Sequence, residues 1–250
     1  MQFRNLASRV LLTIAYSKPV TPFPKAWRMV AIPVNYLAHL HLADDTPESK
    51  VGNVLADFVK GPEVELLPPE ILRGVRLHRA VDSYTDSHPV VMRSIRRLEG
   101  RLGWYAGIVI DVYYDHILAR TWRHYSRESL RSFADRAYQV LGDHIDLLHG
   151  DSRKLMERLI REDRLVSYQT RTGIEETLER ISWRIMERMP KREVRLQDAM
   201  PLLITADAGL EDDFHSFYPQ LIAFAEARKR VLVPTNLVTP PALRMVESPA

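Results

Sequence analysis

Cysteine is absent from this chain of 250 residues. The absence excludes a disulfide framework and every thiolate metal site, so any bound metal must use His, Asp and Glu as ligands. Such ligands favour a hydrolytic ion such as Mn, Mg, Fe or Zn over a structural zinc.

Long hydrophobic runs are missing as well. Runs such as VLLTIAY at 10–16 are far shorter than the roughly 20 apolar residues that cross a bilayer. We therefore expect no membrane-spanning helix and a cytoplasmic protein.

Several motifs that identify common enzymes are also absent. The sequence has no Walker loop, GxGxxG, GxSxG or HExxH. Alternating patterns of the kind typical of β-strands are almost absent too. The missing motifs speak against nucleotide-binding and serine-hydrolase functions, and the missing strand patterns favour an all-helical fold.

The net charge of +3 is unevenly distributed along the chain. Residues 1–33 contribute +5 and residues 229–250 contribute +2, so the residues between them carry −4. The basic character therefore belongs to the two ends, and it does not indicate nucleic-acid binding by the core.

We predict three parts from this composition. Residues 1–33 contain four prolines and no sustained periodicity, which indicates a disordered extension, a transit peptide or a translation start assigned too far upstream. Of these, a start near Val34 is favoured by the family resemblance given below, which implies a start at Asn35-Tyr36-Leu37. Residues 34–228 form the predicted helical domain, and residues 229–250 form a disordered tail.

Helical periodicity dominates residues 34–228, with Pro and Gly marking the loops between periodic segments. The pattern predicts a single-domain, all-α helical bundle. The expected helical segments are 35–60 with a turn near 44–47, then 69–84, 89–101, 104–125, 127–142, 151–162, 171–188 and 195–227.

Two pairs of chemistry-bearing residues recur at a spacing of four. His78 and Asp82 stand in LHRAVDSYTD, and Asp111 and Asp115 stand in GIVIDVYYDHIL. Residues four apart lie on one face of a helix, so each pair directs two ligand-type side chains toward one place. Buried carboxylates are costly unless they are ion-paired or bind a metal. The two pairs predict a hydrolytic metal centre, with Arg-paired carboxylates as the alternative.

Other residues are weaker candidates for the same centre. Asp57 is a lone acid in the apolar segment GNVLADFVKG, and His116 follows Asp115 with a rotation of about 100°. His39 and His41 are two residues apart and point roughly 200° from each other on a helix, so we expect at most one of them at the site.

The stretch 73–101 is rich in arginine. A solvated helix face explains such a run, and an anion-binding surface for a phosphate or an acidic protein beside the metal is the sharper interpretation. The residues that we assign to substrate or partner binding are Arg73, Arg76, Arg79, Arg93 and Arg97.

Several segments together resemble one known family, the acyl carrier protein phosphodiesterases. The segments are NYLAHLHLA, GNVLADFVKG, GVRLHRAVDSYTDSHP, GIVIDVYYDHILARTW and FYPQLIAFA, in this order, over about residues 34–228. The resemblance implies a divergent, HD-domain-like metal phosphohydrolase that removes 4′-phosphopantetheine from holo acyl carrier protein, with manganese as the favoured cation. The departures are Ala80 and Thr121, where the family often has basic residues.

The resemblance also implies which residues form the site. The expected metal ligands are Asp57, His78, Asp82, Asp111, Asp115 and His41, and the expected catalytic residues are His78, His116 and Asp57. The expected partner is the acidic carrier protein, and nucleic acid is not expected. Two alternatives stay open: an HD-like phosphohydrolase of a nucleotide or other small phosphoester, and a non-catalytic helical module that binds carrier protein.

Overall fold

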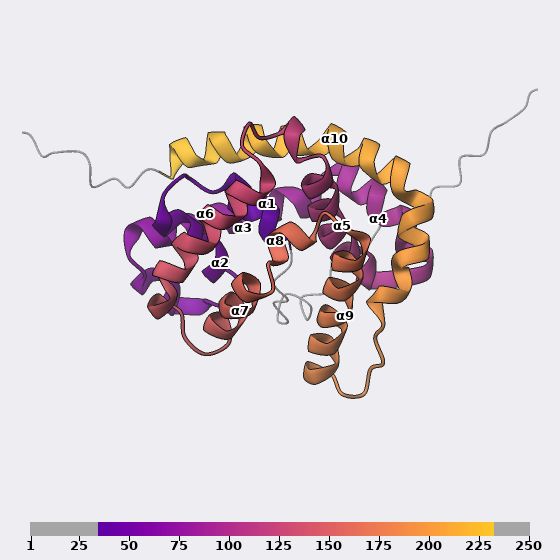
Figure 1. Cartoon of the computed structure of the whole chain (residues 1–250), viewed down its shortest axis with the longest axis horizontal. Coiled ribbons are helices and arrows are strands. Elements are labelled where there is room, and N and C mark those ends of the chain that lie inside the picture. The colour runs from indigo at the N-terminus through magenta and orange to yellow at the C-terminus, as the bar shows by residue number, and fades with distance from the viewer. Residues whose placement is uncertain (1–34, 233–250) are drawn as a thin grey trace, which may run out of the picture.

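A computed structural model describes residues 35–232, and every regular element in this range is a helix (Figure 1). The expected all-α fold is confirmed for these residues. Among them no helix is both long and apolar enough to cross a bilayer. The predictions for residues 1–33 and 233–250 lie outside the described residues.

The helices follow the order expected from the sequence, with short 3₁₀ turns between several of them. The α-helices are α1 Tyr36–Leu42, α2 Pro47–Leu55, α3 Pro69–Ser87, α4 Pro89–Leu102, α5 Ala106–Arg120, α6 Leu130–Asp143, α7 Gly150–Arg161, α8 Arg164–Ser167, α9 Arg171–Arg188 and α10 Met200–Val231.

Local chemistry explains where several helices begin. Thr46, Ser129 and Thr170 precede α2, α6 and α9, and each hydroxyl accepts a hydrogen bond from the backbone N–H three residues later. These caps satisfy donors that a helix start leaves without partners. Pro69 and Pro89 occupy the first turns of α3 and α4, where the missing N–H costs nothing.

The long helix α10 runs along one side of the whole molecule and ties the bundle together (Figure 1). Its buried side chains include Phe214, Phe217 and Leu221. The helix continues to Val231, three residues beyond the boundary at 228 that we expected from the sequence.

Helices α2 and α3 approach at the level of their backbones. A Cβ atom on Gly52 would lie 2.2 Å from the carbonyl oxygen of Ile71, and one on Gly74 would lie 2.5 Å from that of Ser49. Only glycine permits this distance. The contact fixes α3 against the end of α2, where Asp57 follows.

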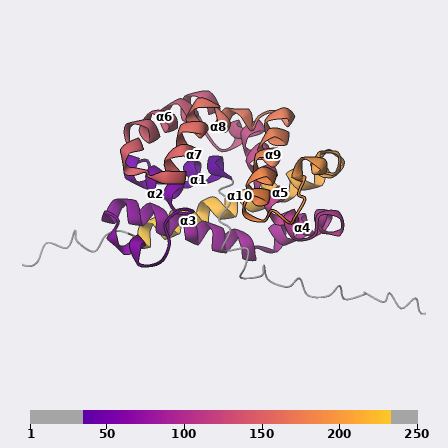
Figure 2. The same cartoon turned by 90° about the horizontal axis from the view of Figure 1, so that it is seen from below.

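Helix α5 lies inside the bundle, with α1 and α9 against it, and Figure 2 shows its place from the second direction. Nearly all its side chains are buried, including Val109, Ile110 and Leu118. A helix enclosed on all sides can present polar residues to several different neighbours, which decides the roles of Asp111, Asp115 and His116 below.

Candidate metal centre

Three side chains from two helices form a compact polar cluster. His39 of α1 and His78 of α3 stack their rings with centroids 3.8 Å apart. The Nε2 atoms of His39 and His78 lie 3.1 and 3.2 Å from the two carboxylate oxygens of Asp82. A single carboxylate therefore faces two imidazole nitrogens.

Asp57 extends the cluster at the end of α2. Its Oδ1 lies 3.5 Å from Nε2 of His78. The side chains of Asp57 and Asp82 are 20% and 44% exposed, whereas both imidazoles are buried. The cluster is therefore open to solvent on the side of the carboxylates.

The pKa values of the two stacked imidazoles shift in opposite directions. Burial lowers the pKa of His78, but the charges and hydrogen bonds of Asp82 and Asp57 outweigh burial and raise that pKa to about 10. Burial and the charge of His78 lower the pKa of His39. Burial also opposes the ionised form of Asp82, but both imidazoles lower its pKa. The two rings and the carboxylate therefore favour one proton more than two neutral imidazoles carry, and they share it as a coupled group.

The residues of the cluster fit a divalent cation. His39, His78 and Asp82 each offer a ligand atom, and these atoms lie within 4.8 Å of one another. Among the described residues, neither ring nitrogen of His39, nor Nδ1 of His78, has a hydrogen-bond partner of normal geometry, although all three atoms are buried. Two imidazoles and a carboxylate suit Mn, Fe or Zn. A cation would replace the shared proton.

Asp111 lies on the side of α5 that faces the acids of α3. Burial raises its pKa well above the ordinary range, and the negative charges of Asp86, Asp82 and Asp115 raise it further. No hydrogen bond or ion pair joins the Asp111 carboxylate to another residue within 35–232. The ionised form of Asp111 is therefore disfavoured in the absence of a cation, as expected for an acid at the edge of a cation site.

Asp115 has a different role. Its two carboxylate oxygens accept hydrogen bonds of 2.9 Å from the backbone N–H groups of Leu37 and Ala38. These are first-turn donors of α1, and Asn35 at the cap position provides no side-chain hydrogen bond. Asp115 therefore caps α1 from another helix, one residue before His39. Burial raises the pKa of Asp115 to about 7 although the two hydrogen bonds oppose the shift.

Two expected histidines lie outside the cluster. Nδ1 of His41 contacts the Tyr218 hydroxyl at 2.8 Å, and its ring packs on Trp122. Nδ1 of His116 contacts the backbone oxygen of Tyr168 at 2.6 Å. His39 therefore replaces His41 in the ligand set, and neither His116 nor Asp115 is directed at the cluster. The expectation that at most one of the α1 histidines reaches the site agrees with this placement.

The arginines that we assigned to a partner mostly contact acids of this chain. Arg73 binds Asp44 at 3.0 Å, and Arg93 and Arg97 bind Asp213 at 2.6 and 3.1 Å. The other two contacts are those of Arg76 with Glu65 and of Arg79 with the backbone oxygen of Val59. These contacts join α3 and α4 to other segments of the same chain. Fewer positive charges of the stretch 73–101 are therefore available to a binding partner.

A cavity of about 350 Å³ opens beside Asp57. Lys60, His149 and Arg188 line it, together with the acids Asp57 and Asp151. Two cationic side chains therefore lie close to the carboxylate edge of the cluster, and two acids share the same lining. The cavity offers room for a small ligand beside the cluster.

Comparisons with known proteins agree with the motifs. A family model described as "Acyl carrier protein phosphodiesterase" matches residues 34–221. Proteins named acyl carrier protein phosphodiesterase from Escherichia coli O157:H7 and Escherichia coli strain K12 / DH10B are 32% identical over 196 residues, which is 78% of this chain and 99% of theirs. No solved structure matches the chain. The matched residues include every member of the cluster, and the chain belongs to the acyl carrier protein phosphodiesterase family.

Proposed function

We propose that the protein is a metal-dependent phosphodiester hydrolase that removes 4′-phosphopantetheine from holo acyl carrier protein. The observation that carries the proposal is the His39, His78 and Asp82 cluster in a chain of this family. The relatives' name supports the carrier protein as substrate. A fold of the HD-domain type remains part of the proposal.

His39, His78 and Asp82 would hold the divalent cation, with Asp57 and Asp111 at its edge. Manganese is the ion that we favour, because imidazole and carboxylate ligands both suit it. When bound, the cation supplies Lewis acidity that favours attack of water on the phosphodiester.

Asp57 is the residue that we assign to proton transfer. It is not among the three side chains whose ligand atoms cluster most closely, and it lines the cavity. Hydrolysis forms a phosphorus–oxygen bond from water and breaks the bond to the serine oxygen of the carrier protein. Asp57 can accept the proton that the water loses, and the serine oxygen must gain one. Lys60 and Arg188 would balance the charge of the phosphate.

Mass spectrometry of holo carrier protein incubated with the enzyme and Mn tests the proposal. We expect the phosphopantetheine mass to be lost with the wild type and with His124→Ala, an exposed histidine outside the cluster. We expect a loss of activity by at least about 100-fold with Asp82→Asn and with His39→Ala. Intact holo protein at every enzyme concentration would remove the carrier protein as substrate.

Hydrolysis of a small phosphoester is a second candidate. The observation that favours it is the cavity beside Asp57, whose volume of about 350 Å³ is in the range of small-molecule sites. A panel of small phosphodiesters, tested in competition with holo carrier protein, separates the two functions. A protein that binds no metal and shows no metal-dependent thermal shift would instead be a non-catalytic binding module.

A further inference from the structure

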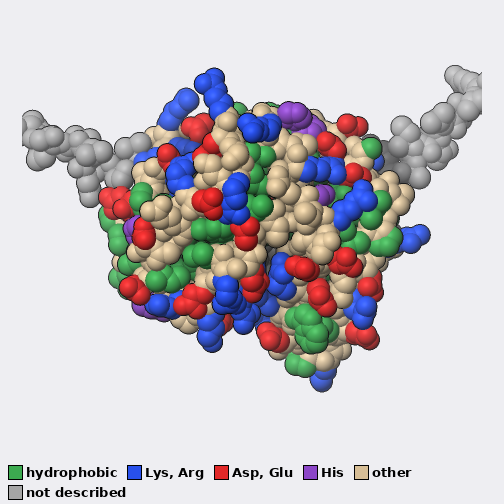
Figure 3. Space-filling view, in the orientation of Figure 1, with side chains coloured by type: hydrophobic (Ala, Val, Ile, Leu, Met, Phe, Trp, Pro, Cys, Tyr) green, Lys and Arg blue, Asp and Glu red, His purple; other side chains and the backbone are tan. Residues whose placement is uncertain are grey.

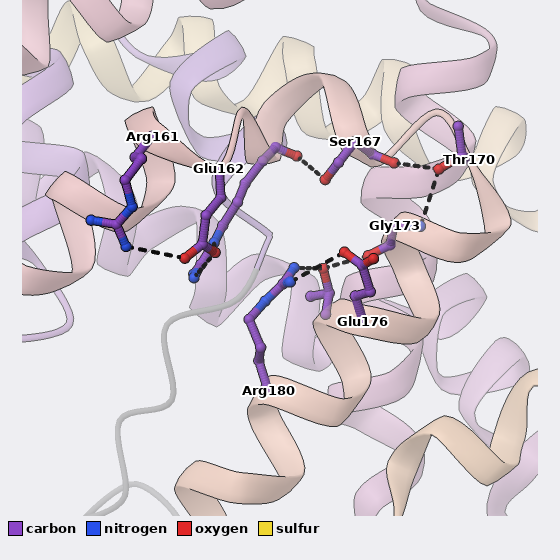
Figure 4. Close-up of polar contacts among 9 residues, drawn as sticks. Arg161, Glu162, Ser167, Thr170, Gly173, Glu176 and Arg180 are labelled. Atoms are coloured by element: carbon purple, nitrogen blue, oxygen red, sulfur yellow. Dashed lines mark hydrogen bonds and ion pairs between the residues drawn. The ribbon is translucent and has the colours of Figure 1, made fainter.

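A second, smaller pocket lies where α8 and α9 meet the beginning of α1. Its lining includes Arg164, Arg180 and Arg184, together with Tyr36. Arg180 and Arg184 are one turn apart on α9, so they share a face. Figure 4 shows Arg180 on α9 with its guanidinium directed at Glu176 of the same helix. Figure 3 shows Lys and Arg side chains gathered between the positions of α7 and α9.

One carboxylate beside this pocket is shared by two arginines. Glu162 accepts hydrogen bonds of 3.0 and 2.6 Å from Nε and a terminal nitrogen of Arg164, which is buried. Glu162 also lies 3.4 Å from Arg161. The single carboxylate of Glu162 therefore compensates the charges of two guanidinium groups.

The remaining two arginines are less compensated. Glu176 lies 3.5 Å from Arg180, which also donates a hydrogen bond of 2.8 Å to Thr177. Burial and the positive charge of Arg164 lower the pKa of Arg180. Within residues 35–232 no acid pairs with Arg184. The pocket therefore contains more positive than negative charge.

A buried hydroxyl completes the pocket. Tyr36 is 5% exposed, and its Oη has no hydrogen-bond partner among residues 35–232. Burial and the charge of Asp57 raise the pKa of Tyr36, while the charge of Arg184 opposes the shift. The hydroxyl therefore lies near both the basic pocket and the acid at the edge of the candidate metal centre.

We propose that the pocket of Arg164, Arg180, Arg184 and Tyr36 is a binding site for a phosphate group. Its free volume of about 20 Å³ admits one or two oxygen-sized groups, so it suits the terminal oxygens of an oxyanion and not a base or sugar. Planar guanidinium groups bind phosphate oxygens in pairs, and a tyrosine hydroxyl donates a further hydrogen bond. If the proposed function holds, the molecule that bears this phosphate would be released 4′-phosphopantetheine, bound through its phosphomonoester end. The phosphate site itself does not depend on that function.

Titration of the full-length protein with inorganic phosphate, in the presence of a metal chelator, tests the site by calorimetry and thermal shift. The chelator removes any contribution of the metal centre. We expect saturable binding to the wild type, and at least about tenfold weaker binding to Arg184→Gln and to Arg180→Gln. Tyr36→Phe should weaken binding by a smaller factor, since it removes one neutral donor.

Arg123→Gln is the matched control, because Arg123 is an exposed arginine outside this pocket. It should bind phosphate as the wild type does. Circular dichroism shows whether each variant is folded. If an arginine variant is unfolded, Tyr36→Phe still tests the site. Absence of saturable binding to the wild type, or equal weakening by Arg123→Gln, overturns the site. Phosphate binding in a protein that leaves holo carrier protein intact would support the site and refute the proposed function.

Discussion

The replacement Asp115→Asn distinguishes a helix cap from a metal ligand. Asp115 is fully buried and accepts hydrogen bonds from the N–H groups of Leu37 and Ala38. Asparagine keeps the shape but has one acceptor oxygen, and its amide group would face a second donor. A cap stabilises the protein with or without metal, whereas a ligand contributes only when metal is present.

The size of the effect follows from these two hydrogen bonds. Loss of one charge-assisted bond costs about 1.5–3 kcal/mol, and an orphaned buried N–H costs about 1–3 kcal/mol. Burial raises the pKa of Asp115 to about 7, which reflects the desolvation cost of its ionised form. Asparagine is neutral and avoids that cost, which offsets part of the loss. We therefore expect a net loss of about 2 kcal/mol at pH 7, which corresponds to a decrease in Tm of about 4–8 °C for a domain of this size.

Urea and thermal denaturation in the presence of a chelator measure this loss. Asp111→Asn is the matched control, because Asp111 lies one turn away on the same helix with no hydrogen bond and with acidic neighbours. Burial already disfavours the ionised form of Asp111, so asparagine at this position should leave metal-free stability unchanged or increase it. Equal stability of Asp115→Asn and the wild type in chelator would refute the cap. Equal losses for both variants would show that any polar change in α5 destabilises the fold.

Three further predictions concern packing, pH and metal. Gly74→Ala places a Cβ atom 2.5 Å from a backbone oxygen and should cost about 2–3 kcal/mol by urea denaturation, whereas Gly100→Ala has open space and should be neutral or stabilising. Burial opposes ionisation of Asp213, but its arginine and serine partners outweigh burial and lower its pKa. The stabilisation that they give is present above about pH 4 and is lost as the pH falls further. Asp213→Asn should reduce this acid-side loss of stability in denaturation curves. Added Mn should raise the Tm of the wild type and not that of His39→Ala; an equal rise in both would exclude His39 as a ligand.

The sequence predicts the helices well because their ends have local causes. Prolines at first turns and hydroxyl caps place the starts of α3, α4 and α9 within a residue or two. The short helix α8 and the 3₁₀ turns are missed, since three to six residues are too few to show periodicity. The spacing of His78 and Asp82 is sufficient to predict their convergence, because both lie on one helix.

The packing between helices determines which residues of different helices contact one another, and the spacing of residues along one helix cannot predict these contacts. Helix α1 is buried on most sides, so hydrophobicity could not choose between His39 and His41. Asp111 and Asp115 share a face of α5, yet one faces acids of α3 and the other the start of α1. The partner of Arg93 is Asp213, which is 120 positions away. Such contacts have no local pattern in the sequence.

The geometry of the candidate centre depends on backbone contacts more than on the ligands themselves. Two stacked imidazoles remain together only if α1 and α3 keep their positions. Gly52 and Gly74 hold α3 against α2 at a distance that any side chain would increase. Asp115 holds the first turn of α1 through two backbone N–H groups, immediately before His39. A carboxylate that caps α1 cannot at the same time offer those lone pairs to a cation. The two acids of α5 therefore have different surroundings: Asp115 accepts hydrogen bonds from the first turn of α1, and Asp111 lies beside the acids of α3 with no hydrogen bond to another described residue.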